Sequence, residues 1–224
     1  MIVRENQPIT LIGGATVAPE RLSAALRHAT QVVAADGGAD TALAAGLSLR
    51  AVIGDFDSIS AVARARLPDA ILHPMTDQDT TDFEKCLAHV GAPLLIGLGF
   101  TGGRIDHQMA ACTALVRHDA QRCILLGDVD LMFLCPPSLS LPLEAGCRVS
   151  LFPMGAVEGA SDGLRWPIGG LRLAPDGRIG TSNIAEGTVT IDVTAPKLLV
   201  ILPAETLDLV APALLAAPAG WSAA

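Results

Sequence analysis

The sequence is short of basic residues. Its 224 residues include 15 lysines and arginines against 23 aspartates and glutamates, a formal net charge of −8 at pH 7. A protein that wraps DNA or RNA needs a basic surface to displace counterions, so this balance argues against a nucleic-acid partner. A small anionic ligand such as a nucleotide is not excluded, because metal ions, helix N-termini and a few arginines can supply positive charge locally.

Long apolar runs are missing as well. The mean hydropathy is high, at +0.47, yet no apolar run approaches the roughly 18 residues that a membrane-spanning helix needs. The segment from Met1 to Asn6 has no basic region followed by an apolar stretch, so no secretory signal is predicted. We therefore expect a cytoplasmic protein without a membrane partner.

The sequence also lacks a C-x-x-C pair. Its five cysteines are odd in number and lie in apolar surroundings: Cys86, Cys112, Cys123, Cys135 and Cys147. This pattern argues against a zinc site and against a disulfide framework. We expect buried free thiols.

Apolar residues make up 50% of the chain, which is ample for a buried core. In the first part, short apolar runs alternate with helical patterns, for example a strand at 9–12 before a helix at 19–29. This alternation favours a parallel sheet covered on both faces. We therefore predict an α/β domain over residues 1–136, a Rossmann-like three-layer arrangement.

The pattern changes after about residue 135. Short alternating runs at 148–152, 170–173 and 188–193 follow two consecutive prolines, and residues 175–177 predict a turn. These features predict a C-terminal all-β domain over residues 137–224, an antiparallel sandwich or half-barrel. Within it, residues 204–224 are expected to form a short helix with a loose tail.

Aspartates gather after the predicted strands of the first domain. Asp55 and Asp57 follow one strand, and Asp77, Asp79 and Asp82 follow the next. The strand ends of an open α/β sheet meet at one edge, where ligands bind. Such crowding of carboxylates favours a hard divalent cation with oxygen ligands, Mg²⁺ above all. The first pair, at positions i and i+2 of an extended segment, points the same way and predicts metal ligation in preference to a structural turn.

The helix predicted after this acidic stretch begins with a capping box at residues 81–84. Its buried stripe is expected to consist of Phe83, Cys86, Leu87 and Val90, with Gly91 ending the helix. Asp82 and Lys85 lie on another face. Alone they would indicate a helix-start carboxylate and a surface ion pair. Beside the other aspartates, Asp82 is instead predicted to take part in the site.

Two glycine-rich turns allow more than one interpretation. Asp36, Gly37 and Gly38 form either a tight βα turn or a carboxylate beside a backbone that a ligand can approach closely. The segment from Gly97 to Gly102 matches G-x-G-x-x-G, and Asp128 follows the next strand, so a nicotinamide-dinucleotide-dependent oxidoreductase is an alternative. That alternative leaves the acidic stretches unexplained and puts the fingerprint late in the domain.

Read over residues 99–107, the second turn instead predicts a cradle for polyphosphate. Glycine amides and a helix N-terminus would hold the anion, and Arg104 would act as a charge clamp. His107, in the first helical turn, is either a ligand contact or a packing group. A nucleotide-sensing module without catalysis would keep these turns but would not need so many aspartates.

Trp166 stands out in the second domain, because it is one of two tryptophans in a chain without tyrosine. Its ring is suited either to stacking on an aromatic ligand, cationic ones included, or to a sandwich core.

These stretches, in this order, resemble the thiamine pyrophosphokinase family. The resembling segments are residues 35–39, 54–58, 77–85, 102–107, 163–166 and 182–183. The ordered set is specific, although no one motif is decisive. The resemblance implies an α/β domain, a β domain, and a homodimer with active sites at the subunit junction. It also implies transfer of the diphosphoryl group of ATP to the hydroxyl of thiamine, with release of AMP.

The resemblance assigns expected roles by position. The implied Mg²⁺ ligands are Asp55, Asp57 and Asp82. The implied nucleotide-binding set is Asp36, Gly37, Gly38, Asp79, Lys85, Gly102, Gly103, Arg104, Asp106 and His107. The residues matched to thiamine are Trp166, Ser182 and Asn183. Catalysis is expected from Asp57, Asp82 and Arg104, with Asp57 or Asp82 accepting the hydroxyl proton.

Overall fold

The computed structural model describes residues 1–77, 79–218 and 221. The chain divides into two compact units, Met1–Ala114 with Leu125–Asp128, and Leu115–Ile124 with Val129–Ala224. Gln78 of the acidic stretch lies outside the described residues, as does most of the predicted C-terminal tail. No helix of the described part is long and apolar enough to cross a membrane.

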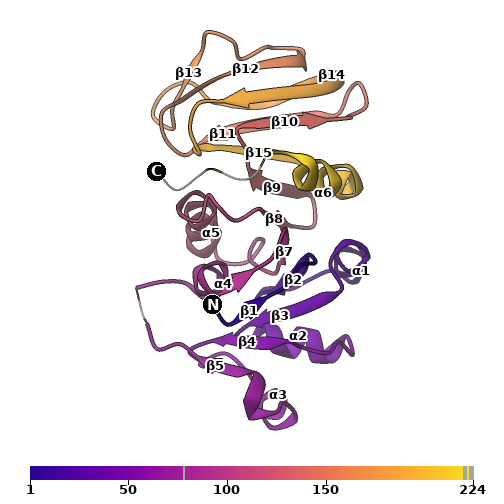
Figure 1. The fold of residues 1–224 in the computed structure, drawn as a ribbon, viewed down its shortest axis with the longest axis vertical. Helices are drawn as coiled ribbons and strands as arrows, with labels where there is room; N and C mark the ends of the chain where they lie inside the picture. Colours follow the sequence, from indigo (N-terminus) through magenta and orange to yellow (C-terminus); the bar gives the residue numbers. More distant parts are fainter. Residues whose placement is uncertain (78, 219–220, 222–224) are drawn as a thin grey trace. The chain divides into compact units, whose positions relative to one another are not determined.

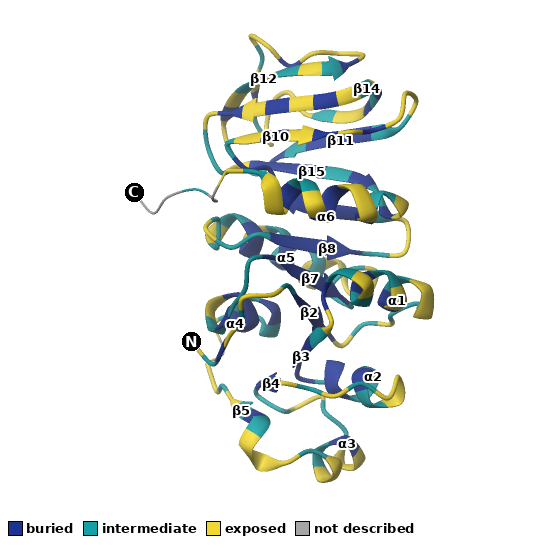
Figure 2. Ribbon diagram, turned by 45° about the vertical axis from the view of Figure 1, so that its right-hand side comes forward, coloured by how far each residue is buried: buried dark blue, intermediate teal, exposed yellow. Residues whose placement is uncertain are grey.

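A parallel sheet forms the centre of the first unit (Figure 1). Its neighbouring strands are, in spatial order, β7 (Leu95–Leu98), β2 (Ile9–Ile12), β3 (Gln31–Ala35), β4 (Ala51–Gly54) and β5 (Leu72–Pro74). Every residue of β2, β4 and β7 is buried, as Figure 2 shows in dark blue. Burial on both faces explains why these strands are continuous apolar runs in the sequence.

Helices follow the strands of this unit. They are α1 (Pro19–His28), α2 (Gly38–Ala44), α3 (Ala61–Arg66), α4 (Asp82–His89) and α5 (Ile105–Arg117), with a 3-10 turn, η1 (Asp69–Ile71), before β5. In both ribbon views α1 and α2 lie on one side of the sheet and α4 on the other (Figures 1 and 2). The helix predicted at 19–29 is confirmed as α1, which ends at His28 and buries Leu22 and Ala25.

The end of α4 differs from the expectation. The helix stops at His89, and the next two residues form β6 (Val90–Gly91), which pairs in parallel with β1 (Val3–Arg4). Val90 is buried as predicted, but as part of this strand pair. Periodicity cannot reveal such a pair, because two residues are too few to show a repeat.

The second unit is built from antiparallel strands. In spatial order they are β9 (Asp130–Leu134), β15 (Leu198–Pro203), β11 (Arg148–Pro153), β14 (Gly180–Val193), β12 (Val157–Leu164) and β13 (Arg172–Leu173), and β10 (Ser138–Leu141) also pairs with β14. The runs predicted at 148–152 and 188–193 are confirmed as strand, but of the run at 170–173 only Arg172–Leu173 is strand. β9 has no counterpart among the predicted strands.

The remaining elements complete this unit. A 3-10 turn, η2 (Ala204–Thr206), leads into α6 (Leu207–Ala216), which confirms the predicted C-terminal helix. Strand β8 (Cys123–Leu126) falls where the chain passes between the two units. All five cysteines are free thiols; Cys86, Cys123 and Cys135 are buried, whereas Cys112 and Cys147 are half-buried.

Candidate functional site

Asp36 lies at the centre of the carboxyl edge of the parallel sheet. It follows β3, and its backbone adopts φ +41, a left-handed conformation that aspartate tolerates better than most residues. Its side chain is 1% exposed. The two carboxylate oxygens accept hydrogen bonds from the backbone N–H groups of Ser58, at 3.3 Å, and Ile59, at 3.0 Å. Asp36 therefore holds the loop that follows the neighbouring strand β4.

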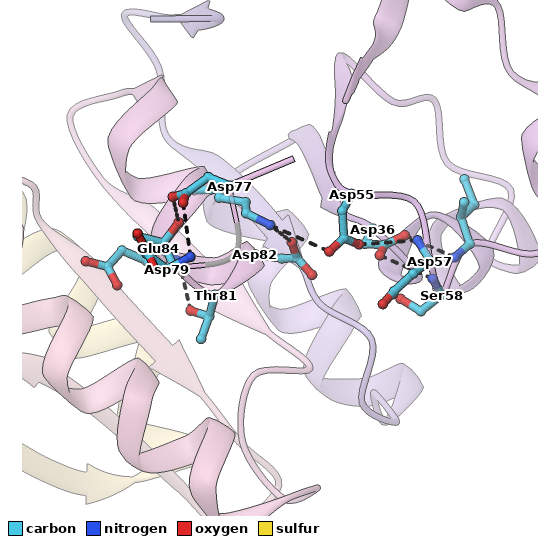
Figure 3. A network of polar contacts seen from close by, with 12 residues as sticks. Asp36, Asp55, Asp57, Ser58, Asp77, Asp79, Thr81, Asp82 and Glu84 are labelled. Atoms are coloured by element: carbon cyan, nitrogen blue, oxygen red, sulfur yellow. Dashed lines mark hydrogen bonds and ion pairs between the residues drawn. The ribbon is translucent and has the colours of Figure 1, made fainter. Parts of the chain in front are cut away.

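That loop brings two further carboxylates to Asp36. In the described part of the chain, Asp36, Asp55 and Asp57 each offer an oxygen within 4.8 Å of the other two (Figure 3). The loop bends at Phe56, with φ +66, and the Asp57 N–H donates to Asp55 Oδ1 at 3.3 Å. Three carboxylates at this spacing, one of them fully buried, form a donor set that suits a hard divalent cation.

Burial makes this group electrostatically costly without a cation. Desolvation raises the pKa of the Asp36 carboxyl, and the hydrogen bonds from Ser58 and Ile59 oppose that shift only in part. The negative charge of Asp57 raises the pKa of Asp36 further. A cation among the three carboxylates would remove this cost.

Lys85 supplies a positive charge beside the group. Its ammonium lies 3.0 Å from Asp82 Oδ1 and 4.0 Å from Asp55 Oδ2, and the side chain is 4% exposed. A surface ion pair between Asp82 and Lys85 is therefore ruled out. Burial raises the pKa of Asp82, the hydrogen bond from Lys85 lowers it, and the charges of Asp36 and Asp55 raise it again. The charges of the other carboxylates thus act on Asp82. The three carboxylates whose oxygens lie within 4.8 Å of one another are nevertheless Asp36, Asp55 and Asp57, so Asp36 stands where the sequence predicted Asp82.

Asp40 fixes the far end of the same loop, a role with no counterpart in the sequence prediction. The Ser60 N–H donates to Asp40 Oδ2 at 2.9 Å, and the Ser60 hydroxyl donates to Oδ1. Ser60 Oγ also accepts the Ala63 N–H at 3.0 Å and so caps α3. From the sequence, an aspartate in the first turn of a helix is expected to stabilise the helix dipole. The hydrogen bonds of Asp40 with Ser60 could not be predicted, because they depend on the tertiary fold.

The second acidic stretch is organised as a turn that leads into α4. Asp77 accepts hydrogen bonds from the Asp79 N–H at 3.0 Å and from the Thr80 hydroxyl at 2.7 Å, and these bonds lower its pKa. Asp79 itself is exposed. Thr81 caps α4 by accepting the Glu84 N–H at 3.3 Å, as the capping box predicts. Of the aspartates in this stretch, Asp82 is the one brought to the carboxylate group.

A cavity of about 440 Å³ opens beside these residues within the first unit. Its lining includes several residues predicted for nucleotide binding or catalysis: Asp36, Gly37, Asp82, Gly103, Arg104 and His107. The described lining does not include Gly38, Asp55, Asp57, Asp79, Lys85, Gly102 or Asp106. Buried carboxylates, a glycine turn and an arginine therefore surround one space.

The predicted charge clamp is paired within its own turn. Arg104 is largely exposed and forms a two-point contact with Asp106, Nε to Oδ1 at 3.1 Å and Nη2 to Oδ2 at 2.5 Å. This contact lowers the pKa of Asp106 and raises that of Arg104. The Gly102 N–H is directed to Gln108 Oε1 at 3.4 Å. A phosphate that binds Arg104 must therefore compete with the Asp106 carboxylate.

Packing accounts for the first two glycines of the G-x-G-x-x-G match. A Cβ on Gly97 would lie 3.1 Å from the Phe100 ring, and a Cβ on Gly99, which has φ +73, would lie 2.7 Å from the Gly13 carbonyl oxygen. Gly97 thus makes room for Phe100, and Gly99 allows close approach to Gly13. A Cβ on Gly102 would meet no atom within 4 Å, but Gly102 has φ +81, a left-handed conformation that favours glycine. Packing and backbone conformation thus explain these glycines without a dinucleotide.

In the second unit, the side-chain amide of Asn183 is hydrogen-bonded to the backbone of Trp166. The Asn183 amide donates to the Trp166 carbonyl at 2.7 Å, and the Trp166 N–H donates back to Asn183 Oδ1 at 3.2 Å. Trp166 is 56% exposed, which rules out the sandwich-core alternative, and the Arg165 guanidinium lies 5.8 Å from its ring centre. Ser182 has φ +61, and its N–H donates to Ser150 Oγ at 3.0 Å.

Both parts of the chain match models of one family. Residues 22–126 match the thiamin pyrophosphokinase catalytic domain, and residues 138–198 match the vitamin B1 binding domain of the same family. The chain belongs to the thiamin pyrophosphokinase family. The cavity and its carboxylates lie within the catalytic match, whereas Trp166, Ser182 and Asn183 lie within the vitamin B1 binding match.

Curated thiamine pyrophosphokinases resemble the chain in sequence. Thiamine pyrophosphokinase 1 of Oryza sativa subsp. japonica is 33% identical over 152 residues, which cover 59% of this chain and 58% of the relative. Thiamine pyrophosphokinase 1 of Arabidopsis thaliana is 29% identical over 160 residues, which cover 62% and 60%. The chain thus spans about three fifths of the length of these curated relatives.

The fold is that of solved thiamin pyrophosphokinases. The Candida albicans structure superposes with a TM-score of 0.75 at 15% identity, covering 88% of this chain and 89% of that one. The Geobacillus thermodenitrificans structure gives a TM-score of 0.75 at 23% identity, covering 88% and 97%.

Proposed function

We propose that this chain transfers the diphosphoryl group of ATP to the hydroxyl of thiamine, forming thiamine diphosphate and AMP. The observation that carries the proposal is the convergence of Asp36, Asp55 and Asp57 at one sheet edge, within the part of the chain that matches the catalytic domain. An alcohol that attacks a phosphorus needs positioning and charge neutralisation more than a covalent nucleophile.

The metal expected here is Mg²⁺, because the donors are carboxylate oxygens and the substrate is a polyphosphate. Asp36, Asp55 and Asp57 would hold it, with Asp82 as the further ligand expected from the sequence. When bound, the ion supplies charge neutralisation for the phosphates. Lys85 keeps Asp55 and Asp82 near each other through its two carboxylate contacts.

The proton of the thiamine hydroxyl needs an acceptor. Asp57 and Asp82 are the two candidates for this acceptor. Asp82 lines the cavity, where a substrate can reach it. We therefore favour Asp82 over Asp57 for this step.

The nucleotide would take the glycine turns and the charge clamp. Arg104 would exchange its contact with Asp106 for a phosphate contact, which the exposure of both side chains permits. Gly37, Gly103 and His107 line the same cavity and would approach the phosphates. The turns that contain Asp79, Gly38 and Gly102 would position the residues that contact the nucleotide.

Thiamine would bind at the exposed ring of Trp166, whose face suits an aromatic cation. Asn183 uses its amide on the Trp166 backbone, so it would position the ring, with Ser182 beside it.

The same proposal includes a homodimer with shared sites, a domain boundary at residues 136/137 and a cytoplasmic location. It also describes the first domain as a Rossmann-like three-layer arrangement and the second as a sandwich or half-barrel.

A direct assay tests the function. Purified protein is incubated with ATP, Mg²⁺ and thiamine, and the nucleotide products are separated by chromatography. We expect AMP and thiamine diphosphate in equal amounts. ADP in place of AMP would indicate a monophosphate-transferring kinase, and absence of thiamine-dependent nucleotide turnover would contradict the proposal.

The carboxylate group is tested by substitution. Asp55→Asn and Asp57→Asn should each lower turnover by roughly 10²-fold or more, the scale seen when a charge-stabilising group is removed. Asp69→Asn is the matched control, because Asp69 is an exposed aspartate whose carboxylate forms an ion pair with Arg64. Near-normal turnover in both site variants, with melting temperatures like that of the control, would remove the metal-site interpretation.

A further inference from the structure

Phe56 lies between the two aspartates that follow β4. The loop from β4 to α3 comprises residues 55–60, and Asp55 and Asp57 flank Phe56 within it. The Phe56 backbone has φ +66, a left-handed conformation. In the described part of the chain, Asp36 and Ser182 are the other non-glycine residues with a positive φ. For a bulky side chain this conformation is an outlier, because Cβ crowds the following carbonyl.

A residue keeps such a conformation only where its surroundings impose it. The hydrogen bonds to Asp36 and Asp40 hold the part of the loop that follows the bend, at Ser58, Ile59 and Ser60. At the bend itself, the Asp57 N–H donates to Asp55 Oδ1 at 3.3 Å, which is long for such a bond. The contacts of the Phe56 ring are therefore the stronger hold at the bend.

The Phe56 ring packs against a small apolar cluster of the first unit. The buried members of this cluster are Ala34, Ala39, Val52 and Leu72, and the partly buried residues that pack against it with Phe56 are Leu49, Ile59 and Leu67. The Arg64 guanidinium of α3 lies 6.0 Å from the ring centre. Burial of an aromatic ring removes a large apolar area from water, which offsets the cost of the backbone conformation.

The bend separates the directions of neighbouring side chains. The Phe56 ring goes to the apolar cluster, whereas Asp55 and Asp57 each place an oxygen within 4.8 Å of Asp36. A left-handed residue changes the direction of the chain and so brings its two neighbours together. One bend thus connects the packing of the cluster with the position of two carboxylates.

Glycine is the residue that adopts this φ without strain. Glycine has no side chain to pack, however, and it would leave the loop free to take other conformations. Phenylalanine at position 56 restricts the loop to one conformation at the expense of backbone strain. Ligands of a metal ion need such support, because the ion accepts only a narrow range of distances.

We propose that Phe56 is a positioning residue, whose anchored ring holds the bend that sets Asp55 and Asp57 against Asp36 for one divalent cation. Phe56 touches neither the cation nor a substrate and acts through the two aspartates. That the cation is Mg²⁺ in the service of diphosphoryl transfer rests on the proposed function. The effect of the ring on cation binding does not.

The test measures binding of Mn²⁺ alone, a paramagnetic substitute for Mg²⁺, from the electron paramagnetic resonance signal of the free ion. The proteins are the wild type, Phe56→Gly, Phe56→Leu and the control Leu67→Ala. Leu67 packs on the same cluster but follows α3, outside the loop. We expect Phe56→Gly to weaken Mn²⁺ binding about 10-fold or more, the scale for residues that support metal ligands, and the other two variants to weaken it less than about threefold.

Glycine distinguishes the anchor from the backbone conformation. If only the left-handed conformation mattered, Phe56→Gly would bind Mn²⁺ at least as tightly as the wild type, and that result would overturn the inference. So would equal weakening in Leu67→Ala, or no Mn²⁺ binding by the wild type. Melting curves recorded in EDTA establish that each variant folds. If Phe56→Gly does not fold, Phe56→Asn replaces it, because asparagine tolerates the left-handed region.

Turnover provides a second measurement. Phe56→Gly should need about 10-fold more Mg²⁺ for half-maximal rate, whereas its KM for thiamine should change by less than about twofold. An unchanged Mg²⁺ requirement in an active variant would contradict the inference. If the Mn²⁺ results are as expected but the wild type forms no thiamine diphosphate, the proposed function alone fails and the inference stands.

Discussion

Lys85 is the residue at which the sequence pattern is least informative. A lysine in the first half of a short helix is expected at the surface, yet this one is buried against Asp82 and Asp55. The chain has one other lysine, Lys197, and that one is exposed. A buried lysine beside crowded carboxylates reduces their mutual repulsion in the folded chain.

Replacement of Lys85 by methionine should therefore destabilise the fold. We expect a loss of about 2 kcal/mol at pH 7, below the roughly 3–5 kcal/mol of a fully buried pair, because both carboxylates still reach water. Chemical denaturation of Lys85→Met and of the control Lys197→Met measures the difference. Equal stability of the two variants would show that the buried ion pair is energetically neutral.

The destabilisation should depend on pH in a definite direction. The hydrogen bond from Lys85 lowers the pKa of Asp82, so its loss raises the folded-state pKa further above that of the unfolded chain. A carboxyl raised in this way costs stability as the pH rises through the raised pKa. The deficit of Lys85→Met should thus shrink between pH 7 and pH 5, whereas a constant deficit would point to lost packing.

Other residues of the site follow from the sequence to different degrees. Asp55 and Asp57 can be predicted as a pair from their i and i+2 spacing alone. Their approach to Asp36 cannot, because it depends on the pairing of β3 with β4, which sets Ala35 opposite Ile53. Phe100 and Phe83 are 17 positions apart, and nothing local indicates that their rings meet.

At the scale of elements, α2 and β2 meet at a glycine. A Cβ on Gly38, the first residue of α2, would lie 1.9 Å from the carbonyl oxygen of Ile12, the last residue of β2. Backbone atoms cannot move aside as a flexible side chain can. The close approach of this helix to this strand therefore requires glycine, and of the two glycines in the turn Gly38 is the one that the packing demands.

Gly38→Ala should destabilise the fold by about 3 kcal/mol or more, at the upper end of overpacking costs, because the strand or the helix must shift. Gly14→Ala is the control. Gly14 lies two residues after the end of β2, and the added methyl there meets no atom within 4 Å. Thermal unfolding followed by circular dichroism compares the two. Equal melting temperatures would contradict the close approach.

The longer elements could be predicted and the short ones could not. The apolar run of β2 and the capping box of α4 each carry a clear local pattern. The pair of β1 and β6 has two residues on each side and no period to detect. β9 ends at Leu134, with Cys135 between it and a proline pair, and is recognisable only through its antiparallel pairing with β15.

Across both units, the reactivity of the cysteine thiols measures how well the folded chain excludes solvent from its interior. Burial raises the pKa of Cys86 and Cys135 strongly and that of Cys112 and Cys147 as well. A raised pKa leaves little thiolate at pH 8, and the thiolate is the reactive form. The expectation of buried thiols holds for Cys86, Cys123 and Cys135, whereas Cys112 and Cys147 are half-buried.

Alkylation by iodoacetamide at pH 8 should therefore be slow in the native protein. We expect Cys147 and Cys112, which are half-buried, to be modified before Cys86, Cys123 and Cys135. All five should react rapidly in guanidinium chloride, which serves as the control. Peptide mass spectrometry identifies the modified sites. Early modification of Cys86 or Cys135 would mean that the chain opens around them.

Strand order is the global property that local patterns leave undetermined. The alternation of strands and helices predicts a parallel sheet, but the return of β7 to the side of β2 follows from how the whole unit closes. This return places the loop that follows β7 beside the loop that follows β2, where a Cβ on Gly13 would lie 2.6 Å from the Phe100 ring.

The pairing of β1 with β6 links the first residues of the chain to a helix more than 80 positions away. The Ile2 N–H donates to the His89 carbonyl at 2.8 Å, and the Glu5 N–H donates to the Gly91 carbonyl at 2.9 Å. The helix braced in this way, α4, carries Asp82 and Lys85 in its first turn. Trimming or replacing residues 1–5 would therefore loosen the helix that carries both residues, although neither of them lies near the altered positions in the sequence.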